Sequence, residues 1–377
     1  MSTARHTSSR PTLRYSRPCT TSRLDSVPSK VLGSVLGSVL GREGSEVSDG
    51  NEVSATRGRS VLVTGAGGYI GRLLIDHLAS ERASGETLVA LDLREIPEAE
   101  RLPGVVYRGG DVRDPELAEL LREHAVDTVV HLAAIVTPGP KSNRELEYSV
   151  DVLGTRNVLE ACLAAGVRKI IVTSSGAAYG YHADNPVPLD EDDALRGNPE
   201  FAYSDHKRQV EEMLAHHREA HPELEQLVFR PGAILGDQVA NQITALFEKP
   251  VVLGVAGSDA PFTFVWDRDV VGCIARGIRE DHSGIFNLAG GGATSMREIA
   301  QRLGKPYLPL PAWLLEGALA LLHPLGLSQY GPEQVGFLRY RPVLSNRRLV
   351  AEFGYTPKLT SNEVFERYRE QRGLGRP

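Results

Sequence analysis

The sequence predicts an α/β protein in which a doubly wound parallel sheet is joined to a smaller C-terminal domain. Six apolar runs alternate with helical patterns: VLVTG (61–65), TLVALDL (87–93), VVYRGGD (105–111), TVVHLAA (128–134), KIIVTSS (169–175) and QLVFRPG (226–232). Continuous Val, Ile and Leu runs indicate strands covered by helices on both faces, and hence parallel pairing. After residue 232 the order is less regular and richer in Pro and Gly, which indicates the second domain.

The chain of 377 residues exceeds what one compact core usually holds. We expect residues 59–232 and 266–290 to form the sheet domain, and residues 233–265 and 291–370 to form the smaller domain. Residues 1–58 are rich in Ser, Thr and Arg and contain the repeat VLGSVLGSVLG. This composition predicts a disordered N-terminal extension. An organellar transit peptide and a start codon assigned too far upstream are also compatible with it.

Composition excludes several classes of function. A formal net charge of -6 argues against nucleic-acid binding, which usually leaves a basic footprint. Cys19, Cys162 and Cys273 are far apart and odd in number, so they predict neither a disulfide framework nor a CxxC pair. We therefore expect a reducing compartment, the cytoplasm. No stretch supplies the roughly 20 apolar residues of a membrane span.

The first apolar run leads directly into TGAGGYIGRLLIDHL (64–78), where Gly65, Gly68 and Gly71 recur at every third position before a helical pattern. A turn without Cβ atoms lets backbone N–H groups approach a pyrophosphate, and the helix N-terminus adds its positive dipole end. The alternative is a glycine-rich turn without a ligand. A position between a buried strand and a helix favours the phosphate-binding turn.

Asp92 ends the second run, about twenty residues after the turn, where a carboxylate accepts hydrogen bonds from an adenosine ribose. A carboxylate here repels the 2′-phosphate of NADP, so we expect NAD, with NADP less favoured. Arg94, two residues later, softens that preference. A solvated acid at the end of a strand is the alternative.

Other residues reach the same carboxyl edge of the sheet, where open α/β sheets bind ligands. They are Asp111 and Val112 after the third run, Leu132, Ala133 and Ala134 after the fourth, Thr173 in the fifth and Pro231 in the sixth. For His131 we prefer a packed strand histidine to a metal ligand. His217 and His221 are four apart in HREAH, which we interpret as solvated helix-end histidines, so no metal site is expected.

The segment FAYSDHKRQVEEML (201–214) predicts an amphipathic helix, with an apolar stripe through Val210 and Leu214 and with Glu211 and Glu212 facing water. Tyr203 and Lys207 are four apart, so a phenol and an ammonium share one helix face. They form either a surface pair or a catalytic base with its tuning cation.

The serines that end the fifth run, Ser174 and Ser175, give the pair a context at the carboxyl edge. A free tyrosine, with a pKa of about 10, is a poor base at neutral pH. A neighbouring ammonium and a positively charged nicotinamide would stabilise its phenolate. In this arrangement Ser175 orients the substrate hydroxyl, Tyr203 is the general base and Lys207 is the tuning cation.

Together these motifs resemble the NAD-dependent epimerase/dehydratase branch of the extended short-chain dehydrogenase/reductase superfamily, over roughly residues 60–370. The resemblance implies a Rossmann-type sheet domain that binds NAD, and a C-terminal domain that covers a substrate, often a nucleotide sugar. It implies catalytic roles for Ser175, Tyr203 and Lys207. It assigns the cofactor turn to Gly65, Gly68, Tyr69, Ile70 and Gly71, the ribose to Asp92 and the adenine to Asp111 and Val112. FVWDRDVV (264–271) and IFNLAGG (285–291) resemble the segments that close the sheet and return to the substrate domain.

Two departures from the family pattern concern the substrate side. Asp151 stands where family members usually carry Asn, and RPGAILG (230–236) offers Gly232 and Ala233 where nucleotide-sugar epimerases often place an Asn. The apolar segment 307–327 predicts a lid or a packed core, and a site for an apolar substrate is the alternative.

The sequence thus predicts an NAD-dependent oxidoreductase acting on a carbinol or carbonyl carbon of a small molecule. A nucleotide-sugar epimerase or dehydratase with tightly bound NAD stays open, as does a non-catalytic dinucleotide sensor and a homodimer. We expect a modest-sized hydroxyl or carbonyl compound, with a nucleotide sugar as the alternative. If the substrate carries a diphosphate, its candidate ligands are Arg268, Arg297, Arg339 and Arg341.

Overall fold

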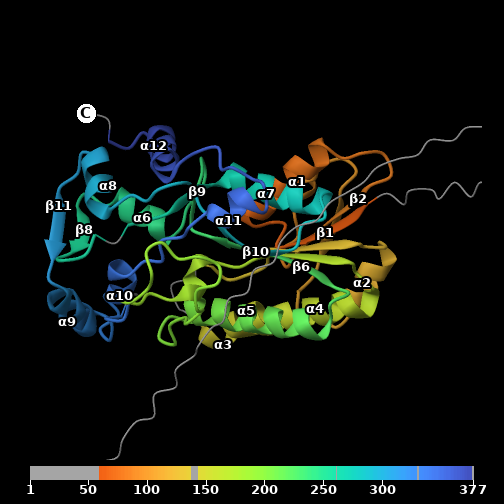
Figure 1. The fold of residues 1–377 in the computed structure, drawn as a ribbon, viewed down its shortest axis with the longest axis horizontal. Coiled ribbons are helices and arrows are strands. Elements are labelled where there is room, and N and C mark those ends of the chain that lie inside the picture. The colour runs from red at the N-terminus through yellow and green to blue at the C-terminus, as the bar shows by residue number, and fades with distance from the viewer. Residues whose placement is uncertain (1–58, 137–142, 260, 329–330, 376–377) are drawn as a thin grey trace, which may run out of the picture. The chain divides into compact units, whose positions relative to one another are not determined.

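A computed structural model of the protein describes residues 59–136, 143–259, 261–328 and 331–375. The predictions for residues 1–58, including Cys19, lie outside the described residues. The described residues all belong to one compact unit by their internal contacts. Its centre is a parallel sheet to which all six predicted runs contribute (Figure 1).

The sheet contains β1 (Ser60–Thr64), β2 (Thr87–Asp92), β3 (Val106–Gly109), β4 (Thr128–His131), β5 (Lys169–Thr173), β6 (Glu225–Pro231) and β10 (Gly284–Leu288). Their order is β10-β6-β5-β4-β1-β2-β3, and every neighbouring pair is parallel. The doubly wound parallel sheet predicted from the apolar runs is therefore confirmed. The segment IFNLAGG supplies β10, which closes the sheet beside β6 as the resemblance implied.

Helices cover both faces of this sheet (Figure 1). On one face lie α1 (Tyr69–Ser80) and α7 (Asp267–Arg279), which bury Leu74 and Ile274 against it. On the other face lie α2 (Leu117–Glu123), α4 (Gly154–Ala165) and α5 (Ala202–Ala220), which bury Leu121, Leu159 and Leu214. The strands lack a polar face because apolar helices cover them from both sides.

Short helical segments join these layers near the carboxyl edge. They are η1 (Glu98–Glu100), α3 (Arg144–Tyr148), the π-helical turn η2 (Ser149–Leu153) and the 3-10 turn η3 (Gly176–Tyr179).

The C-terminal part adds two small parallel sheets, each of two strands: β7 (Ala233–Leu235) with β9 (Phe264–Trp266), and β8 (Val252–Val255) with β11 (Tyr307–Leu310). Around them lie α6 (Gln242–Glu248), α8 (Met296–Arg302), α9 (Ala312–Leu322), α10 (Gln334–Arg339), α11 (Arg347–Ala351) and α12 (Ser361–Gln371). Phe247, Phe264 and Phe365 form the centre of a separate apolar core. The exact domain boundaries stay a prediction.

The apolar segment 307–327 is not a packed core. No residue of α9 is buried, and Trp313 and Leu321 are 71% and 66% exposed. The lid and the site for an apolar substrate both stay predictions for this segment. No described helix is long and apolar enough to cross a membrane.

A buried ion pair connects α5 to the sheet. The guanidinium of Arg230 donates to both carboxylate oxygens of Glu211, at 2.8 and 2.9 Å, and both side chains are about as buried as the apolar core. Arg230 also donates to the Tyr179 hydroxyl at 2.8 Å, and Tyr179 donates to Asn287 Oδ1. The expectation that Glu211 faces water is therefore wrong. Glu211 lies on the sheet side of α5 because Arg230 pairs with it, whereas Glu212 is exposed as expected.

Replacing Glu211 with Gln should lower the free energy of unfolding by about 3 kcal/mol, because the buried Arg230 charge would lose its partner. The matched control is Glu212→Gln, one residue away and exposed, which should change stability by less than about 0.5 kcal/mol. Urea unfolding of the two variants measures the difference. Equal, small losses would mean that the Arg230–Glu211 pair does not hold α5.

Candidate functional site

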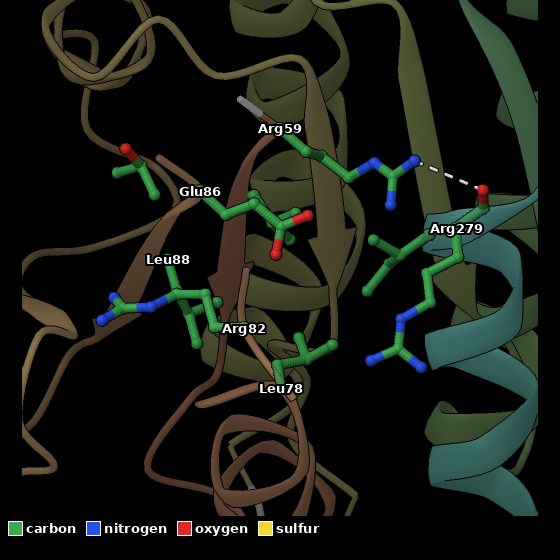
Figure 2. A pocket seen from close by; sticks show the side chains of 9 residues that line it. Arg59, Leu78, Arg82, Glu86, Leu88 and Arg279 are labelled. Atoms are coloured by element: carbon green, nitrogen blue, oxygen red, sulfur yellow. Dashed lines mark hydrogen bonds between the residues drawn. The ribbon is translucent and has the colours of Figure 1, made fainter. Parts of the chain in front are cut away.

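The predicted site residues gather at the carboxyl ends of neighbouring strands. The strand register places Thr64, the last residue of β1, opposite Leu91 and His131, and places Thr173 of β5 opposite Phe229 of β6. The glycine turn, Asp92, the loop after β4 and Ser175 therefore follow adjacent strands at one edge. A hollow lined by Arg59, Arg82, Glu86 and Arg279 lies at the opposite, amino-terminal edge, because Arg59 and Glu86 directly precede β1 and β2 (Figure 2).

The turn after β1 requires glycine at the predicted positions. Gly65 has φ +68°, and a Cβ there would lie 2.8 Å from the backbone nitrogen of Ala133. A Cβ on Gly71 would lie 2.2 Å from the Gly65 carbonyl oxygen. The turn closes through a hydrogen bond from Gly68 N to Gly65 O, and α1 begins at the next residue. This backbone cradle at the start of a 12-residue helix fits a pyrophosphate.

The two remaining residues of the turn differ in surroundings. Ile70 packs against the core of the sheet. The Tyr69 hydroxyl donates to Asp267 Oδ2 at 2.5 Å, and burial together with this carboxylate raises the pKa of Tyr69. Tyr69 thereby connects the turn to the start of α7.

Asp92 lies directly beside the glycine turn. Its Oδ2 accepts from Gly67 N at 2.8 Å, and its Oδ1 accepts from Arg94 N at 2.9 Å. A Cβ on Gly67 would lie 3.0 Å from the Asp92 carboxylate. Gly67 is thus a site residue that the threefold glycine spacing missed, although the double Gly in TGAGG was a signal for it. The Arg94 side chain is largely exposed, with Nε 3.7 Å from Asp92.

Asp111 has a partner of its own. Arg113 donates to both of its carboxylate oxygens, at 2.9 and 2.5 Å, and this bonding lowers the pKa of Asp111. Arg113 also donates to Ser149 at 2.8 Å. Val112 is buried, and its carbonyl accepts from Asn157 of α4. The pair expected to contact adenine is therefore fixed by Arg113 and Asn157, neither of which the sequence indicated.

His131 is the packed strand histidine that we preferred. Its two ring nitrogens lie 2.8 Å from Thr64 Oγ1 and 3.0 Å from Thr155 Oγ1. Burial, followed by the positive charge of Lys207, lowers the pKa of His131 to about 3. No group of three or more His, Cys, Asp or Glu side chains within the described ranges could hold a metal ion.

The fifth strand and α5 bring the proposed catalytic residues together. Ser175 follows β5 in an extended conformation, and its Oγ accepts from Ala177 N at 3.1 Å. Ser204 of α5 donates to the Ala177 carbonyl at 2.7 Å, which fixes the start of α5 against this turn. The Lys207 ammonium donates to the Thr173 carbonyl at 3.3 Å and lies 5.8 Å from the centre of the Tyr203 ring. The phenol and ammonium predicted on one helix face thus lie beside the end of β5.

A row of aromatic rings leads from Tyr203 into the smaller domain. The ring centre of Phe201 lies 6.3 Å from that of Tyr203 and 5.8 Å from that of Phe337. Tyr181 packs against both phenylalanines, at 5.7 and 4.9 Å. These three residues line a hollow of about 270 Å³ together with Asn198, Glu200, Glu333, Gln334 and Gly336.

Arg341 stacks on the far end of this row. Its guanidinium carbon lies 4.9 Å from the Phe337 ring centre and 3.5 Å from that of Phe262. The side chain is buried, and none of its three nitrogens has a hydrogen-bond partner among the described residues. Burial lowers the pKa of Arg341 to about 9. A buried charge without a partner is costly, so this guanidinium calls for an anion.

The other three candidate arginines differ from Arg341. Arg268 and Arg297 are exposed, and Arg339 is half-buried over the Tyr340 ring. Of the four candidate arginines, Arg341 is therefore the one whose side chain is buried.

Comparison with known proteins identifies the family. The model of the NAD dependent epimerase/dehydratase family matches residues 61–289. The chain belongs to this family. The match spans the glycine turn, Asp92, Ser175 and Tyr203 with Lys207, which are the motifs that carried the resemblance.

Among its relatives, an uncharacterized protein of Mycobacterium tuberculosis is 27% identical over 327 residues, covering 83% of this chain and 84% of the relative. A UDP-glucose 4-epimerase of Mycolicibacterium smegmatis is 29% identical over 324 residues, covering 80% and 95%.

Solved structures share the fold. A Thermotoga maritima UDP-glucose 4-epimerase with UDP-glucose has a TM-score of 0.65 at 19% identity, covering 83% of this chain and 98% of the other. MoeE5 in complex with UDP-glucuronic acid and NAD has a TM-score of 0.63 at 25% identity, covering 84% and 100%.

The buried His131 predicts a loss of stability in acid. Its pKa in the folded state lies below the value of about 6.5 in an unfolded chain, so only the unfolded chain takes up a proton as the pH falls from 6.5 toward 3. Between pH 7 and pH 5 this should cost about 2 kcal/mol. The His131→Gln variant should lose correspondingly less stability over this interval, whereas His216→Gln, at an exposed site, should behave as the parent. Urea unfolding at the two pH values measures this, and identical pH slopes for all three proteins would contradict a neutral His131.

Proposed function

We propose that the protein is an NAD-dependent oxidoreductase that transfers hydride between a carbinol or carbonyl carbon of its substrate and nicotinamide. The observation that carries this proposal is the position of Tyr203 and Lys207 beside the end of β5 and Ser175, at the same sheet edge as the glycine turn. A protein that only senses a dinucleotide would have no need for all three side chains.

The three side chains divide the chemistry. Tyr203 takes the proton of the substrate hydroxyl as general base, and Ser175 holds that hydroxyl in line. Lys207, fixed by the Thr173 carbonyl, stabilises the phenolate and holds the cofactor ribose. Nicotinamide, when bound, supplies the hydride acceptor. Epimerisation or dehydration requires that the hydride return to the substrate, whereas simple dehydrogenation releases reduced cofactor.

The remaining expected contacts belong to the cofactor. The cradle at Gly65, Gly68 and Gly71 suits its pyrophosphate, and the rigidly bonded Asp92 suits its ribose and disfavours a 2′-phosphate. NAD is therefore preferred over NADP. Leu132, Ala133 and Ala134 follow β4, the strand next to β1, and Pro231 ends β6, two strands beyond β4; these residues complete the proposed cofactor contacts.

For the substrate we propose a nucleotide sugar. The unpaired guanidinium of Arg341, reached from Tyr203 through Phe201 and Phe337, supports a substrate with an anionic group. A diphosphate provides such a group. The relatives named UDP-glucose 4-epimerase support the same substrate class. The sequence led us to expect a hydroxyl or carbonyl compound, because RPGAILG (230–236) offers no polar side chain after Arg230. An uncharged compound of this kind would leave Arg341 without a partner.

Replacing Tyr203 with Phe should lower turnover at least about 100-fold while changing NAD affinity by less than about threefold, because only the proton acceptor is lost. Lys207→Ala should weaken both turnover and NAD affinity, since Lys207 serves both. Steady-state kinetics and calorimetric NAD titration measure the two effects. A Tyr203→Phe enzyme with near-normal turnover would overturn the assignment of the base.

The substrate class can be tested by thermal shift with NAD present. UDP-glucose should raise the melting temperature of the parent protein by mass action, and Arg341→Met should weaken this binding at least about tenfold. Without ligand, Arg341→Met should be no less stable than the parent, because it removes an unpaired buried charge.

The matched control for that experiment is Arg297→Met, at an exposed position, which should retain the full shift. Stabilisation by uncharged alcohols or ketones alone, with no response to UDP- or GDP-sugars, would contradict the nucleotide-sugar proposal.

A further inference from the structure

Two buried titratable side chains meet behind Lys207. His206 Nδ1 lies 3.6 Å from Asp151 Oδ2, and both side chains are only 2% exposed. Neither of these two atoms has a hydrogen-bond partner among the described residues. The sequence singled out Asp151 as a departure from the family pattern but gave no partner for it.

The two residues belong to segments that frame the proposed nicotinamide site. Asp151 lies in the π-helical turn η2, and its Oδ1 accepts from Ile135 N at 2.8 Å. Ile135 directly follows the proposed cofactor residues Leu132–Ala134 in the loop after β4. His206 precedes Lys207 on α5. Contact between the two side chains therefore ties the cofactor loop to the helix that carries Tyr203 and Lys207.

Electrostatics decide the form of this contact. A buried carboxylate oxygen and a buried imidazole nitrogen, each without a partner, are both costly, and a single proton between them removes both costs. The hydrogen bond from Ile135 N stabilises the ionised carboxylate, so the proton between the two side chains belongs on the imidazole Nδ1.

We propose that Asp151 and His206 form a buried pair, with the Nδ1 proton of His206 facing the Asp151 carboxylate, that positions Lys207 against the cofactor. This inference rests on the proposed function in that Lys207 is taken to hold the cofactor and tune Tyr203. Asp151 and His206 are positioning residues and do not touch the substrate.

Two further side chains lie near Asp151 and His206. His131 is close enough to sense both Lys207, which pushes its pKa down, and Asp151, which pushes it up. The Tyr148 ring of α3 meets the His206 ring edge-on at 5.6 Å.

Charged groups on the elements packed around His206 include Glu147 of α3, and Asp205, which pairs with Arg144 of α3 and Arg208 of α5.

The proton on His206 Nδ1 is read directly by ¹⁵N NMR of histidine-labelled, full-length protein. His206 should show a protonated Nδ1, and Asp151→Asn should change this signal, because the carboxylate that faces the proton is lost. The His206 signal is assigned by its loss in His206→Gln, with the exposed His216→Gln as control. An unprotonated Nδ1 in the parent, or a His206 signal unchanged by Asp151→Asn, would overturn the proposal.

The positioning role is tested by NAD titration of a double-mutant cycle. His206→Leu leaves the Asp151 carboxylate oxygen Oδ2 without a donor and should weaken NAD binding about tenfold. Adding Asp151→Asn removes that charge and should restore affinity to within about threefold of the parent. Losses that simply add would contradict a coupled pair.

Neither experiment needs a substrate. A failure of the proposed chemistry, seen as no turnover with nucleotide sugars, is therefore distinguishable from a failure of the Asp151–His206 pair.

Discussion

The arrangement of the site depends on a buried charge, the guanidinium of Arg230. It is the last but one residue of β6, and it bonds Glu211 of α5, Tyr179 of η3 and the Glu191 carbonyl at the same time. Because each bond replaces water that the charge has lost, the four segments are held in one relative position. Through α5 this fixes where Tyr203 and Lys207 lie, and through η3 it fixes the turn that begins at Ser175. The candidate catalytic residues are therefore positioned by Arg230 and its partners, which take no part in the proposed chemistry.

Much of the fold could be predicted because its signals are local. Continuous apolar runs specify strands covered on both faces, and the alternation with helices specifies a parallel sheet. The signal of the glycine turn is similarly local. A Cβ on Gly71 would collide with the backbone of Gly65, six residues earlier, and a Cβ on Gly65 would collide with Ala133 after the adjacent strand β4. The four-residue spacing of Tyr203 and Lys207 follows from helix geometry alone. Each of these features is determined by residues close in sequence or by adjacent strands.

The features that the sequence did not reveal are buried polar contacts between distant segments. The helical pattern predicts that Glu211 faces solvent, because it contains no information on the contact with Arg230, 19 positions later. Nothing in the spacing of Tyr203 and Lys207 indicates a role for His206 between them. Its contact with Asp151 of η2 becomes visible only in the folded structure. Arg341 was one of four equivalent candidates, and only packing between Phe262 and Phe337 sets it apart. Hydrophobic pattern carries no information on which charges find partners in the interior, so tertiary packing overrides the local expectation.

The central claim is that Tyr203, at this sheet edge, takes the proton of the substrate hydroxyl while hydride passes from the substrate carbon to a bound nicotinamide. The most direct measurement is rapid mixing of the NAD-loaded protein with UDP-glucose while the absorbance and fluorescence of reduced nicotinamide are followed. The account predicts that reduced cofactor forms in the parent protein, transiently if the hydride returns, and that it fails to form in Tyr203→Phe. Formation of reduced cofactor at the same rate in Tyr203→Phe, or its absence from the parent protein with every nucleotide sugar and every alcohol tested, would contradict it.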